Sequence, residues 1–420
     1  MRECMPLMPD LSSVRSCFPA LARVGKDGRP LVFADAPGGS QVPGSVIEAI
    51  ADYLRRSNSN MHGMFETSRE TDEVVDAARR AGADMTGADP DEIVLGPNAT
   101  TLLLGLSRSF GRTLGPGDEI VVTALDHDAN VRPWVLAAED AGATVRWVEV
   151  CHDDVTLDLD SFDAALSDRT RLVAFTLASN AVGTIPHAAE LSRRARAAGA
   201  LVAVDGVHLA QHRAIDIRAI GADILACSPY KFFGPHLGLL AVRRDLLAEW
   251  RPYKLRPAPD EVPARWETGT QNHEGLAGLA AAVDYLAEVG RGFGRPATST
   301  RRDQVLAAFD AIHAHERELS LRFLDGLAGM PQVRLWGIGD PARVDERTPT
   351  FAIRVGKQHP AETAEELGRR GVLVWDGHYY AITVMERLGL LDTGGAVRVG
   401  FCHYHSAEEV DRVLSEIETL

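Results

Sequence analysis

The sequence of 420 residues has only five cysteines and no apolar run long enough to span a bilayer. The cysteines are scattered, odd in number and without the paired spacing of a metal site, so we expect neither a disulfide framework nor a bound metal. The first ten residues, MRECMPLMPD, also lack the basic and apolar segments of a signal peptide. Together these absences predict a protein of the reducing cytoplasm that does not contact a membrane.

Positive charge is scarce as well. The chain carries 44 lysines and arginines against 59 aspartates and glutamates, a formal net charge of −15 with histidine neutral. A surface of that sign aids solubility and repels phosphate backbones, which argues against a nucleic-acid partner. A small anionic ligand would need a local group of lysine, arginine and backbone N–H donors.

Strand-like and helix-like segments alternate through much of the chain. Short apolar runs stand at residues 119–123, 144–150, 171–176, 201–204, 224–227 and 237–242, and helical patterns separate most of them. This alternation predicts an α/β fold with a mainly parallel sheet that is covered on both faces. Later strand-like runs at 350–355, 372–375 and 396–401 lie beside long helical patterns and predict a smaller α+β domain.

The chain is long enough for a large core and a smaller one. Its most linker-like stretch is 291–302, RGFGRPATSTRR, which mixes glycine, proline, serine and arginine without a period. We therefore expect an N-terminal arm at residues 1–30 that packs with the small domain, a large domain at residues 31–290 and the small domain at residues 291–420. A ligand site is expected where the two domains meet.

One lysine has an unusual setting. Residues 224–238, ILACSPYKFFGPHLG, carry Lys231 after an apolar run and before two aromatic residues and a Gly-Pro turn. Burial among apolar neighbours lowers the pKa of a lysine amine, which can then form a Schiff base with a carbonyl such as the aldehyde of pyridoxal phosphate. A solvated lysine beside a strand is the alternative, and it is the commoner case for this motif alone.

A carboxylate stands one strand earlier. Residues 200–212, ALVAVDGVHLAQH, deliver Asp205 to the end of a short apolar strand, the edge at which open α/β sheets bind ligands. A buried carboxylate needs a partner, and the protonated nitrogen of a pyridine ring would serve as one. A helix N-cap or a structural ion pair is the alternative. Asp205 and Lys231 are separated by about one strand–loop–strand unit, so both can converge on one ring.

These motifs, with Gly234 and Pro235 after the lysine, resemble the class V aminotransferase and cysteine desulfurase group of fold-type I pyridoxal-phosphate enzymes. The resemblance runs from about Val32 to the C-terminus, and it is specific because several separated motifs occur in the family's order. It implies a seven-stranded type of sheet in the large domain, pyridoxal phosphate as cofactor, an α-amino acid as substrate and a homodimer.

The resemblance assigns most of a cofactor shell. In residues 124–130, ALDHDAN, it stacks His127 on the cofactor ring, where the imidazole can also relay protons; a histidine that caps the next helix is the alternative. In residues 96–101, GPNATT, it gives Ala99 and Thr100 the cofactor phosphate, a role that suits a helix N-terminus, although an ordinary helix cap would look the same. Lys231, His127 and Asp205 would be the catalytic groups.

Further cofactor contacts follow from the same resemblance. Asn180, in the SNAVGT stretch at 179–184, would donate to the phenolic oxygen of the ring, and Ser228 would bind the phosphate. Gly269 and Thr270, in ETGTQN at 267–272, resemble the segment that reaches the phosphate of the partner subunit. The site would then exist only in a dimer.

Two cofactor positions depart from the family pattern. Tyr230 precedes the lysine where desulfurases have a histidine, so the phosphate cup is altered. His208 stands where the family often has a glutamine that touches the ring oxygen. An imidazole there can tune the pKa of the lysine–cofactor link, and it moves protons better than an amide.

The substrate side departs further. Arg398, in VRVGF at 397–401, matches the arginine that clamps the substrate carboxylate, with a surface arginine on an edge strand as the alternative. The loop that carries the nucleophilic cysteine in desulfurases reads DGHYYA at 376–381 and has Tyr380 at the cysteine's place. A phenol, with a pKa of about 10, cannot accept a persulfide sulfur. His378 also lies on this loop, and Asn60 and His62 fall where relatives contact substrate.

We therefore expect a pyridoxal-phosphate lyase that cleaves the C–S bond of a cysteine S-conjugate by β-elimination, because a missing thiol prevents sulfur transfer but not elimination. Decarboxylation coupled to oxidative deamination, transamination and epimerisation stay open. A protein of this fold without turnover, acting as a scaffold or binding partner, is an alternative from another class. The set of Lys231, Asp205 and Arg398 argues against it, because a scaffold has no need of all three.

Overall fold

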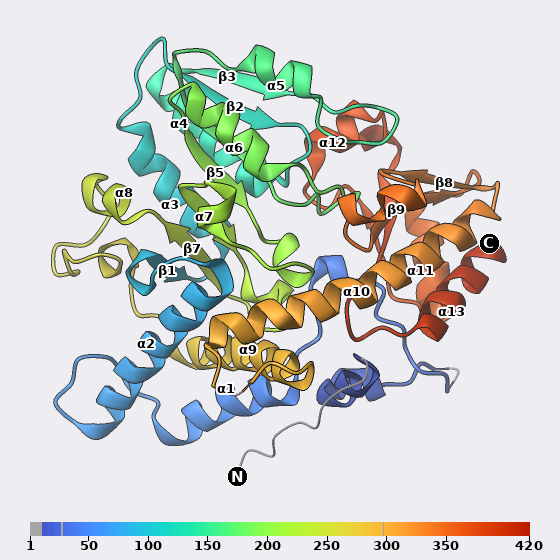
Figure 1. The fold of residues 1–420 in the computed structure, drawn as a ribbon, viewed down its shortest axis with the longest axis horizontal. Helices are drawn as coiled ribbons and strands as arrows, with labels where there is room; N and C mark the ends of the chain where they lie inside the picture. Colours follow the sequence, from blue (N-terminus) through green and yellow to red (C-terminus); the bar gives the residue numbers. More distant parts are fainter. Residues whose placement is uncertain (1–10, 27, 297) are drawn as a thin grey trace.

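The structure, a computed structural model, describes residues 11–26, 28–296 and 298–420, and it contains a seven-stranded and a four-stranded sheet (Figure 1). The larger sheet has the order β1-β7-β6-β5-β4-β2-β3 and is parallel except for β7, which runs antiparallel to both neighbours. Its strands are β1 (Ile93–Gly96), β2 (Glu119–Thr123), β3 (Thr144–Val148), β4 (Thr170–Thr176), β5 (Leu201–Asp205), β6 (Ile224–Cys227) and β7 (Gly238–Val242). The expected α/β fold, with a mainly parallel sheet of seven strands, is confirmed.

Helices cover both faces of the larger sheet, which is why most of its strands are apolar runs, whereas the edge strand β3 alternates exposed and half-buried residues. One face is covered by α3 (Ala99–Gly111), α4 (Arg132–Ala141) and α8 (Arg244–Glu249). The other is covered by α2 (Glu66–Thr86), α5 (Leu159–Ala165), α6 (Ala188–Ala197), α7 (Ile217–Ile220) and α9 (His273–Gly292), with α1 (Gly44–Arg56) packed on α9. Two apolar cores, one on each face, hold the sheet in place.

The four-stranded sheet is antiparallel and has the order β10-β11-β9-β8. Its strands are β8 (Val333–Trp336), β9 (Thr350–Val355), β10 (Trp375–Gly377) and β11 (Ala396–Gly400), and the neighbouring helices are α10 (Arg301–Ala328), α11 (Pro360–Arg369), α12 (Ile382–Arg387) and α13 (Ala407–Glu418). The strands expected at 350–355 and 396–401 are present. The prediction of a strand at 372–375 is wrong. Val372 makes only an isolated bridge with Val32, and the strand β10 begins at Trp375.

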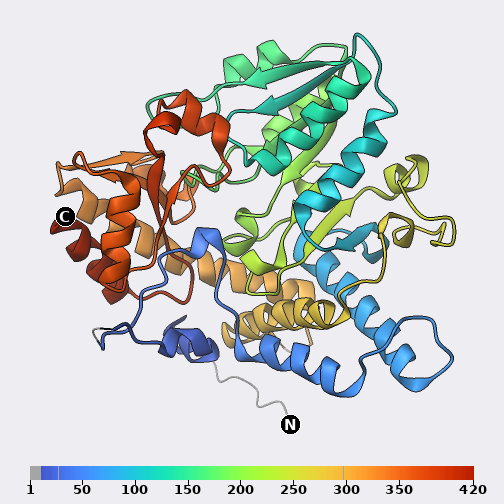
Figure 2. The same ribbon diagram turned by 180° about the vertical axis from the view of Figure 1, so that it is seen from behind.

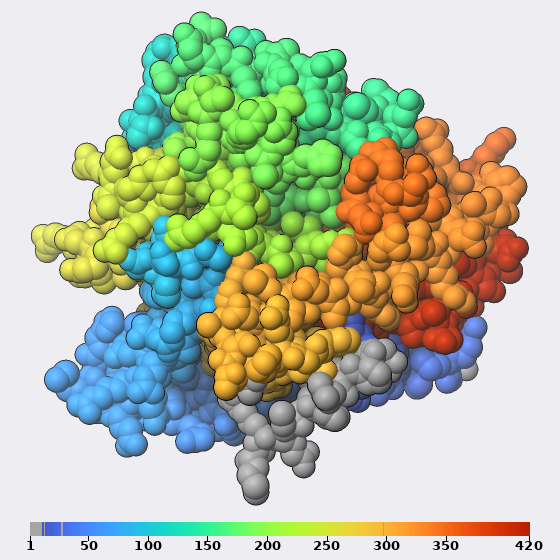
Figure 3. Space-filling view, in the orientation of Figure 1, coloured from blue at the N-terminus to red at the C-terminus, as the bar shows by residue number. Residues whose placement is uncertain are grey.

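The two sheets are tied together by α10 and by the N-terminal segment. The helix α10 packs on α9 and also on α13 (Figure 1). Parallel bridges join Val32 to Val372 and Asp35 to Gly400, so the N-terminal segment (blue) lies beside the C-terminal elements (red) in Figure 2. Figure 3 shows segments coloured green meeting segments coloured orange on one face of the molecule. Asp154, which follows β3, and Arg343, which precedes β9, form an ion pair of 2.7 Å.

The expected arm at residues 1–30 is described from residue 11 onward, except for residue 27. Its Arg15 donates to Glu409 of α13 at 2.6 and 3.0 Å, and Arg29 lies 3.0 Å from Glu416 of the same helix. The division at residues 30 and 290 stays a prediction, as does the role of 291–302 as a linker, where α9 ends and α10 begins. No helix in the described residues has the length and apolar character needed to cross a membrane.

Candidate active site

A cavity of about 870 Å³ opens at the carboxyl ends of the parallel strands, between the two sheets. Segments that follow β2, β4, β5 and β6 line one side, and residues of β10, β11 and the loop after β10 line the other. This is the edge at which open α/β sheets bind ligands, since the loops there diverge and leave room. Of the sequence-predicted residues, the cavity brings together Ala99, Thr100, His127, Asn180, Asp205, His208, Ser228, Tyr230, Lys231, His378, Tyr380 and Arg398.

Lys231 lies on the short 3-10 helix Pro229–Lys231 after β6, and only 7% of it is exposed. Its Nζ donates a hydrogen bond to the carbonyl oxygen of Pro37. Burial lowers the pKa of the amine to about 7, helped by the charge of Arg398 and opposed by the carboxylates of Asp205 and Asp35. The alternative of a solvated lysine is therefore wrong for this side chain, which is a buried amine that is partly neutral near pH 7.

Asp205 is the last residue of β5 and is 5% exposed. Its Oδ1 accepts a hydrogen bond from the backbone N–H of Val207 at 2.8 Å, and no salt bridge to it is found among the described residues. Burial raises the pKa of this carboxyl to about 6, while the Val207 N–H and the charge of Lys231 lower it. Neither a helix cap nor a structural ion pair explains it, so a buried acid stands ready for a cationic partner.

His127 makes the capping contact weighed for it, and its stacking on the cofactor ring stays a prediction. Its Nδ1 accepts the N–H of Ala129 at 3.0 Å and so caps the 3-10 helix Asp128–Asn130, while its ring also lines the cavity. Burial, with the charges of Lys231 and Arg398, lowers the pKa of the imidazole to about 4. The ring is therefore neutral, and because Nδ1 accepts, its proton sits on Nε2.

The start of α3 forms a cradle of backbone N–H groups. Asn98 caps the helix by accepting the N–H of Thr101 at 2.8 Å, and Ala99 and Thr100 are the first two helical residues. A Cβ on Gly238 of β7 would lie 2.2 Å from the Asn98 carbonyl carbon, so only glycine lets β7 approach this turn. The helix N-terminus and the buried Ser228 together suit a phosphate group.

Asn180 and Arg398 are linked. Arg398, 4% exposed on β11, donates from Nη1 to the backbone oxygen of Asn180 at 2.9 Å and lies 4.4 Å from the ring centroid of Tyr379. Burial lowers the pKa of its guanidinium to about 10. Its Nε has no hydrogen-bond partner, and neither does Oδ1 of Asn180, whose Nδ2 donates to the Tyr379 carbonyl at 2.8 Å. A buried arginine with spare donors suits a carboxylate ligand.

The loop after β10 is strained at the cavity mouth. Tyr379 and Tyr380 have φ of 53° and 60°, left-handed values that cost free energy outside glycine. The loop is held by a hydrogen bond from the N–H of Asp128 to the Tyr380 carbonyl, at 2.8 Å, and by Nδ1 of His378, which accepts the N–H of Tyr380 at 3.1 Å. The Tyr380 ring is 66% exposed and lies nearly parallel to His127, with 5.5 Å between centroids.

His208 points away from the solvent. It is 2% exposed, and its Nε2 lies 3.1 and 3.0 Å from the hydroxyls of Thr348 and Thr350, while its Nδ1 has no partner. Burial holds the pKa of this imidazole well below its ordinary value. Tyr230, the other residue that departs from the family pattern, stacks on His236 with 5.0 Å between the ring centroids. Both side chains line the cavity, so both sequence departures alter it directly.

Four predicted residues lie outside this chain's own cavity. Asn60 and His62 are exposed in the turn between α1 and α2, where His62 Nδ1 lies 3.2 Å from Asp72. Gly269 and Thr270 are exposed on the segment before α9. None of the four lines the cavity within one chain.

The sequence interpretation missed the segment after residue 34. Gly38 lines the cavity, Pro37 accepts from Lys231, and burial raises the pKa of the nearby Asp35 to about 6. A Cβ on Gly38 would lie 2.5 Å from the indole of Trp375, which also lines the cavity. The only local signal is the Pro-Gly-Gly run, which marks a turn but says nothing about its neighbours.

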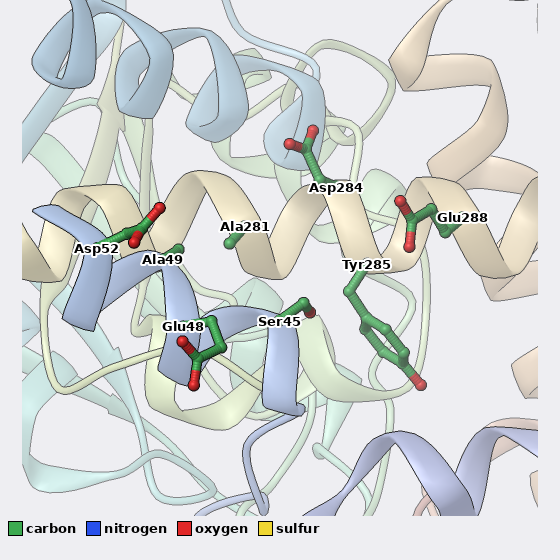
Figure 4. A pocket seen from close by; sticks show the side chains of 8 residues that line it. All are labelled: Ser45, Glu48, Ala49, Asp52, Ala281, Asp284, Tyr285 and Glu288. Carbon is green, nitrogen blue, oxygen red and sulfur yellow. The ribbon is translucent and has the colours of Figure 1, made fainter. Parts of the chain in front are cut away.

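A second hollow of about 440 Å³ lies between α1 and α9 (Figure 4). Its carboxylates are Glu48, Asp52, Asp284 and Glu288, and no lysine or arginine is among its lining residues. A groove of that sign repels an anionic ligand. The larger cavity is therefore the candidate active site.

The residues of the larger cavity fit pyridoxal phosphate. They offer a buried amine of lowered pKa at Lys231, a buried acid at Asp205 for a ring nitrogen, and a helix N-terminus for a phosphate. Unpartnered polar atoms at Asn180 and Arg398 leave donors and acceptors for further groups. In the described residues no cluster of side chains could hold a metal ion. Fold and site thus define a pyridoxal-phosphate-dependent enzyme.

Comparison with known proteins identifies the family. The family model described as Aminotransferase class-V matches residues 32–294 and 303–413, and the chain belongs to that family. It is 33% identical to a probable cysteine desulfurase 2 of Mycobacterium leprae, over 97% of this chain and 96% of the relative. It is 32% identical to an aminotransferase-like protein of Gibberella zeae, over 97% and 98%. A solved cysteine desulfurase of Thermococcus onnurineus, 27% identical, superposes with a TM-score of 0.86 over 99% of both chains.

Proposed function

We propose that the protein is a C–S lyase that converts a cysteine S-conjugate and water into pyruvate, ammonium and a free thiol. The proposal is supported by the cavity lining, which includes Tyr380 and none of the four described cysteines. The resemblance of the loop would put Tyr380 at the place of the desulfurase cysteine. Transfer of sulfur to the enzyme has no acceptor there, whereas elimination needs only a base, a carboxylate anchor and an electron sink.

Each catalytic role is supported by the surroundings of the side chain in the structure. Pyridoxal phosphate, when bound, supplies the electron sink that stabilises negative charge at Cα. The Nζ of Lys231 can hold the Cα proton, because the pKa of this amine, about 7, lets it be neutral near neutrality. Arg398 would bind the substrate carboxylate through the donors that Asn180 leaves free. Asp205 would carry the charge opposite the ring nitrogen.

Three further groups would orient the cofactor. The first N–H groups of α3, at Ala99 and Thr100, and the hydroxyl of Ser228 would bind the phosphate. His127 would cover the ring face and hold a proton at Nε2. His208 would act near the ring oxygen as a neutral imidazole, since burial keeps its pKa low.

We further propose that the working unit is a homodimer. Gly269 and Thr270 are exposed and lie outside the cavity of their own chain, which supports a role in the site of a second copy. Asn60 and His62 are exposed in the same way on another loop and would approach substrate only from a neighbouring subunit. A site shared between two identical chains is a common reason for a two-fold dimer.

One incubation tests the proposed reaction. Purified holoenzyme is mixed with S-methyl- and S-benzyl-cysteine, and pyruvate and free thiol are measured, with Lys231→Ala as the inactive control. Equal release of pyruvate and thiol is expected. Carbon dioxide with oxygen uptake would instead mean oxidative decarboxylation, a keto acid with pyridoxamine phosphate would mean transamination, and racemised substrate would mean epimerisation. Borohydride reduction and peptide mapping, which should label Lys231, check the cofactor link separately.

A further inference from the structure

One side of the active-site cavity is apolar. It is built from the N-terminal halves of α3 and α4, which contribute Leu103, Leu104, Pro133 and Leu136 to the lining, with Ala129 just before α4. Leu103 and Pro133 are buried in the protein core, but Leu104, Leu136 and Ala129 are only partly covered by their own chain. Partly covered aliphatic groups that face a cavity favour an apolar ligand, because contact removes their surface from water.

Free positive charge is limited in the same cavity. The lysine and arginine side chains of its lining are Lys231, Arg398 and Arg132. The first two serve the cofactor and the α-carboxylate in the proposed reaction. Arg132 is already held by Glu139, with 3.1 Å from Nη1 and 3.3 Å from Nη2 to the carboxylate oxygens. A second carboxylate on the substrate would therefore find no lysine or arginine among the lining residues without another partner or role.

The cavity also has room to spare. Its volume of about 870 Å³ lies in the upper part of the range for small-molecule sites, roughly 300–1,000 Å³. The cofactor would lie among Lys231, Asp205 and the start of α3. A substrate side chain that extends from Cα could then reach Leu104 and Leu136, which form the leucine wall of the cavity. The side chain of cysteine, with one methylene and one sulfur, would leave that wall in water.

We propose that the substrate is a monocarboxylic α-amino acid whose side chain is apolar, larger than that of cysteine, and packed on Leu104 and Leu136. In a cysteine S-conjugate this means an aliphatic or aromatic group on sulfur. The inference rests on the proposed function only in that the site binds an α-amino acid at Arg398 and Lys231. It concerns recognition, so it can be tested without the elimination step.

Binding to the holoenzyme is measured by titration calorimetry with L-alanine, L-norleucine, L-phenylalanine, L-glutamate and L-lysine. These probes have no leaving group at Cβ, so they do not depend on C–S cleavage. Norleucine and phenylalanine are expected to bind at least about tenfold more tightly than alanine, since each buried methylene adds affinity. Tighter binding of glutamate or lysine than of norleucine, or equal binding of alanine and norleucine, would overturn the proposal.

A charge placed in the wall tests its location. Leu136→Asp is expected to reduce the ratio of norleucine to alanine affinity by about tenfold, because a carboxylate there must be desolvated by the apolar side chain. Leu104→Ser provides a second, milder change in case the first variant folds poorly. Leu159→Asp, at a half-exposed leucine of α5 outside the cavity, is the matched control and should leave the ratio unchanged.

The outcomes separate the two proposals. Apolar selectivity without thiol release would sustain the recognition proposal and refute the lyase. The opposite outcome is thiol release that is equally efficient for S-methyl- and S-benzyl-cysteine and is unaltered in Leu136→Asp and Leu104→Ser. It would sustain the lyase and refute the recognition proposal. If Leu136→Asp changes the oligomeric state in gel filtration but not the affinity ratio, the wall is a subunit contact and the proposal fails.

Discussion

His212 and Glu316 form a pair in the interior, with 2.9 Å between Nδ1 and Oε2 and side chains that are 0% and 1% exposed. His212 follows β5 of the larger sheet, and Glu316 lies on α10, which also packs on the helices of the smaller sheet. The ring of His208, a residue of the cavity lining, lies 5.1 Å from that of His212. The pair therefore supports the back of the active site.

Removing one member of this pair should cost stability. Glu316→Ala leaves the buried imidazole of His212 without its partner, and we expect the free energy of unfolding to fall by about 3 kcal/mol. Urea unfolding followed by circular dichroism measures the change. Glu318→Ala, an exposed residue on the same helix, is the matched control and should change stability by less than about 0.5 kcal/mol. Equal effects of the two variants would contradict the structural role of the pair.

A methyl group at Gly238 should disturb the phosphate cradle. The added Cβ would meet the backbone of Asn98 and Ala99 at 2.2–2.6 Å, so the turn before α3 must shift. We expect Gly238→Ala to lower stability by about 2 kcal/mol and to weaken retention of pyridoxal phosphate. Cofactor absorbance after dialysis measures the second effect.

Gly105→Ala is the control for that experiment, since a Cβ at this position of α3 has no neighbouring atom within 4 Å. Alanine favours helices over glycine, so this variant should keep its cofactor and gain about 0.5–1 kcal/mol. A Gly238→Ala protein that retains cofactor as well as Gly105→Ala does would show that the cradle lies elsewhere.

Asp126 predicts a pH dependence of stability in the cofactor-free protein. This buried carboxyl accepts hydrogen bonds from Thr123 and from Asn130, the latter at 2.8 Å, yet burial and the charge of Asp205 raise its pKa from 3.8 to about 8. Since its pKa is higher in the folded state, its contribution to stability is full below about pH 4 and is lost as the pH rises through about 8. Asp126→Asn cannot ionise; its Oδ1 can accept from Asn130, and its Nδ2 can donate to the Thr123 hydroxyl in place of the oxygen that accepts.

The comparison is made between chemical denaturation curves at about pH 4, 6 and 8. The unmodified protein should lose more stability across this range than Asp126→Asn, because the other acids whose pKa is raised, Asp35 and Asp205 among them, are present in both. Parallel pH profiles for the two proteins would mean that Asp126 does not hold its proton in the fold.

Mixed dimers test whether the site is shared. Lys231→Ala and Thr270→Ala should each be impaired alone, but a heterodimer of the two contains one site in which Lys231 and the partner subunit's Thr270 are both intact. Co-refolded equal mixtures should regain about a quarter of the original activity, since half of the dimers are mixed and each holds one good site. Activity no greater than the mean of the two variants would place Thr270 outside the partner's site.

The sequence predicts the larger sheet well because its strands are short apolar runs between helical patterns, and Lys231 and Asp205 because each follows such a strand. The smaller sheet is harder: β8 has only four residues of mixed exposure and β10 only three, so neither gives a strong local signal. Pro37 and Gly38 are held at the site by contacts between residues far apart in the sequence, such as the bridge between Asp35 and Gly400 and the hydrogen bond from the Ser40 N–H to the Tyr230 carbonyl. No pattern within a short window reveals such pairings.

That bridge between Asp35 and Gly400 also sets an order of events during synthesis. Pro37, whose carbonyl accepts from Lys231, is translated early. The strand β11, which pairs with the neighbouring Asp35 through Gly400, is translated only near the end of the chain. A nascent or truncated chain that stops before β11 lacks Arg398 and one of the neighbours of its N-terminal segment. The substrate side of the cavity is therefore completed only when translation is nearly finished, and a chain that loses β11 to proteolysis would lack its carboxylate anchor.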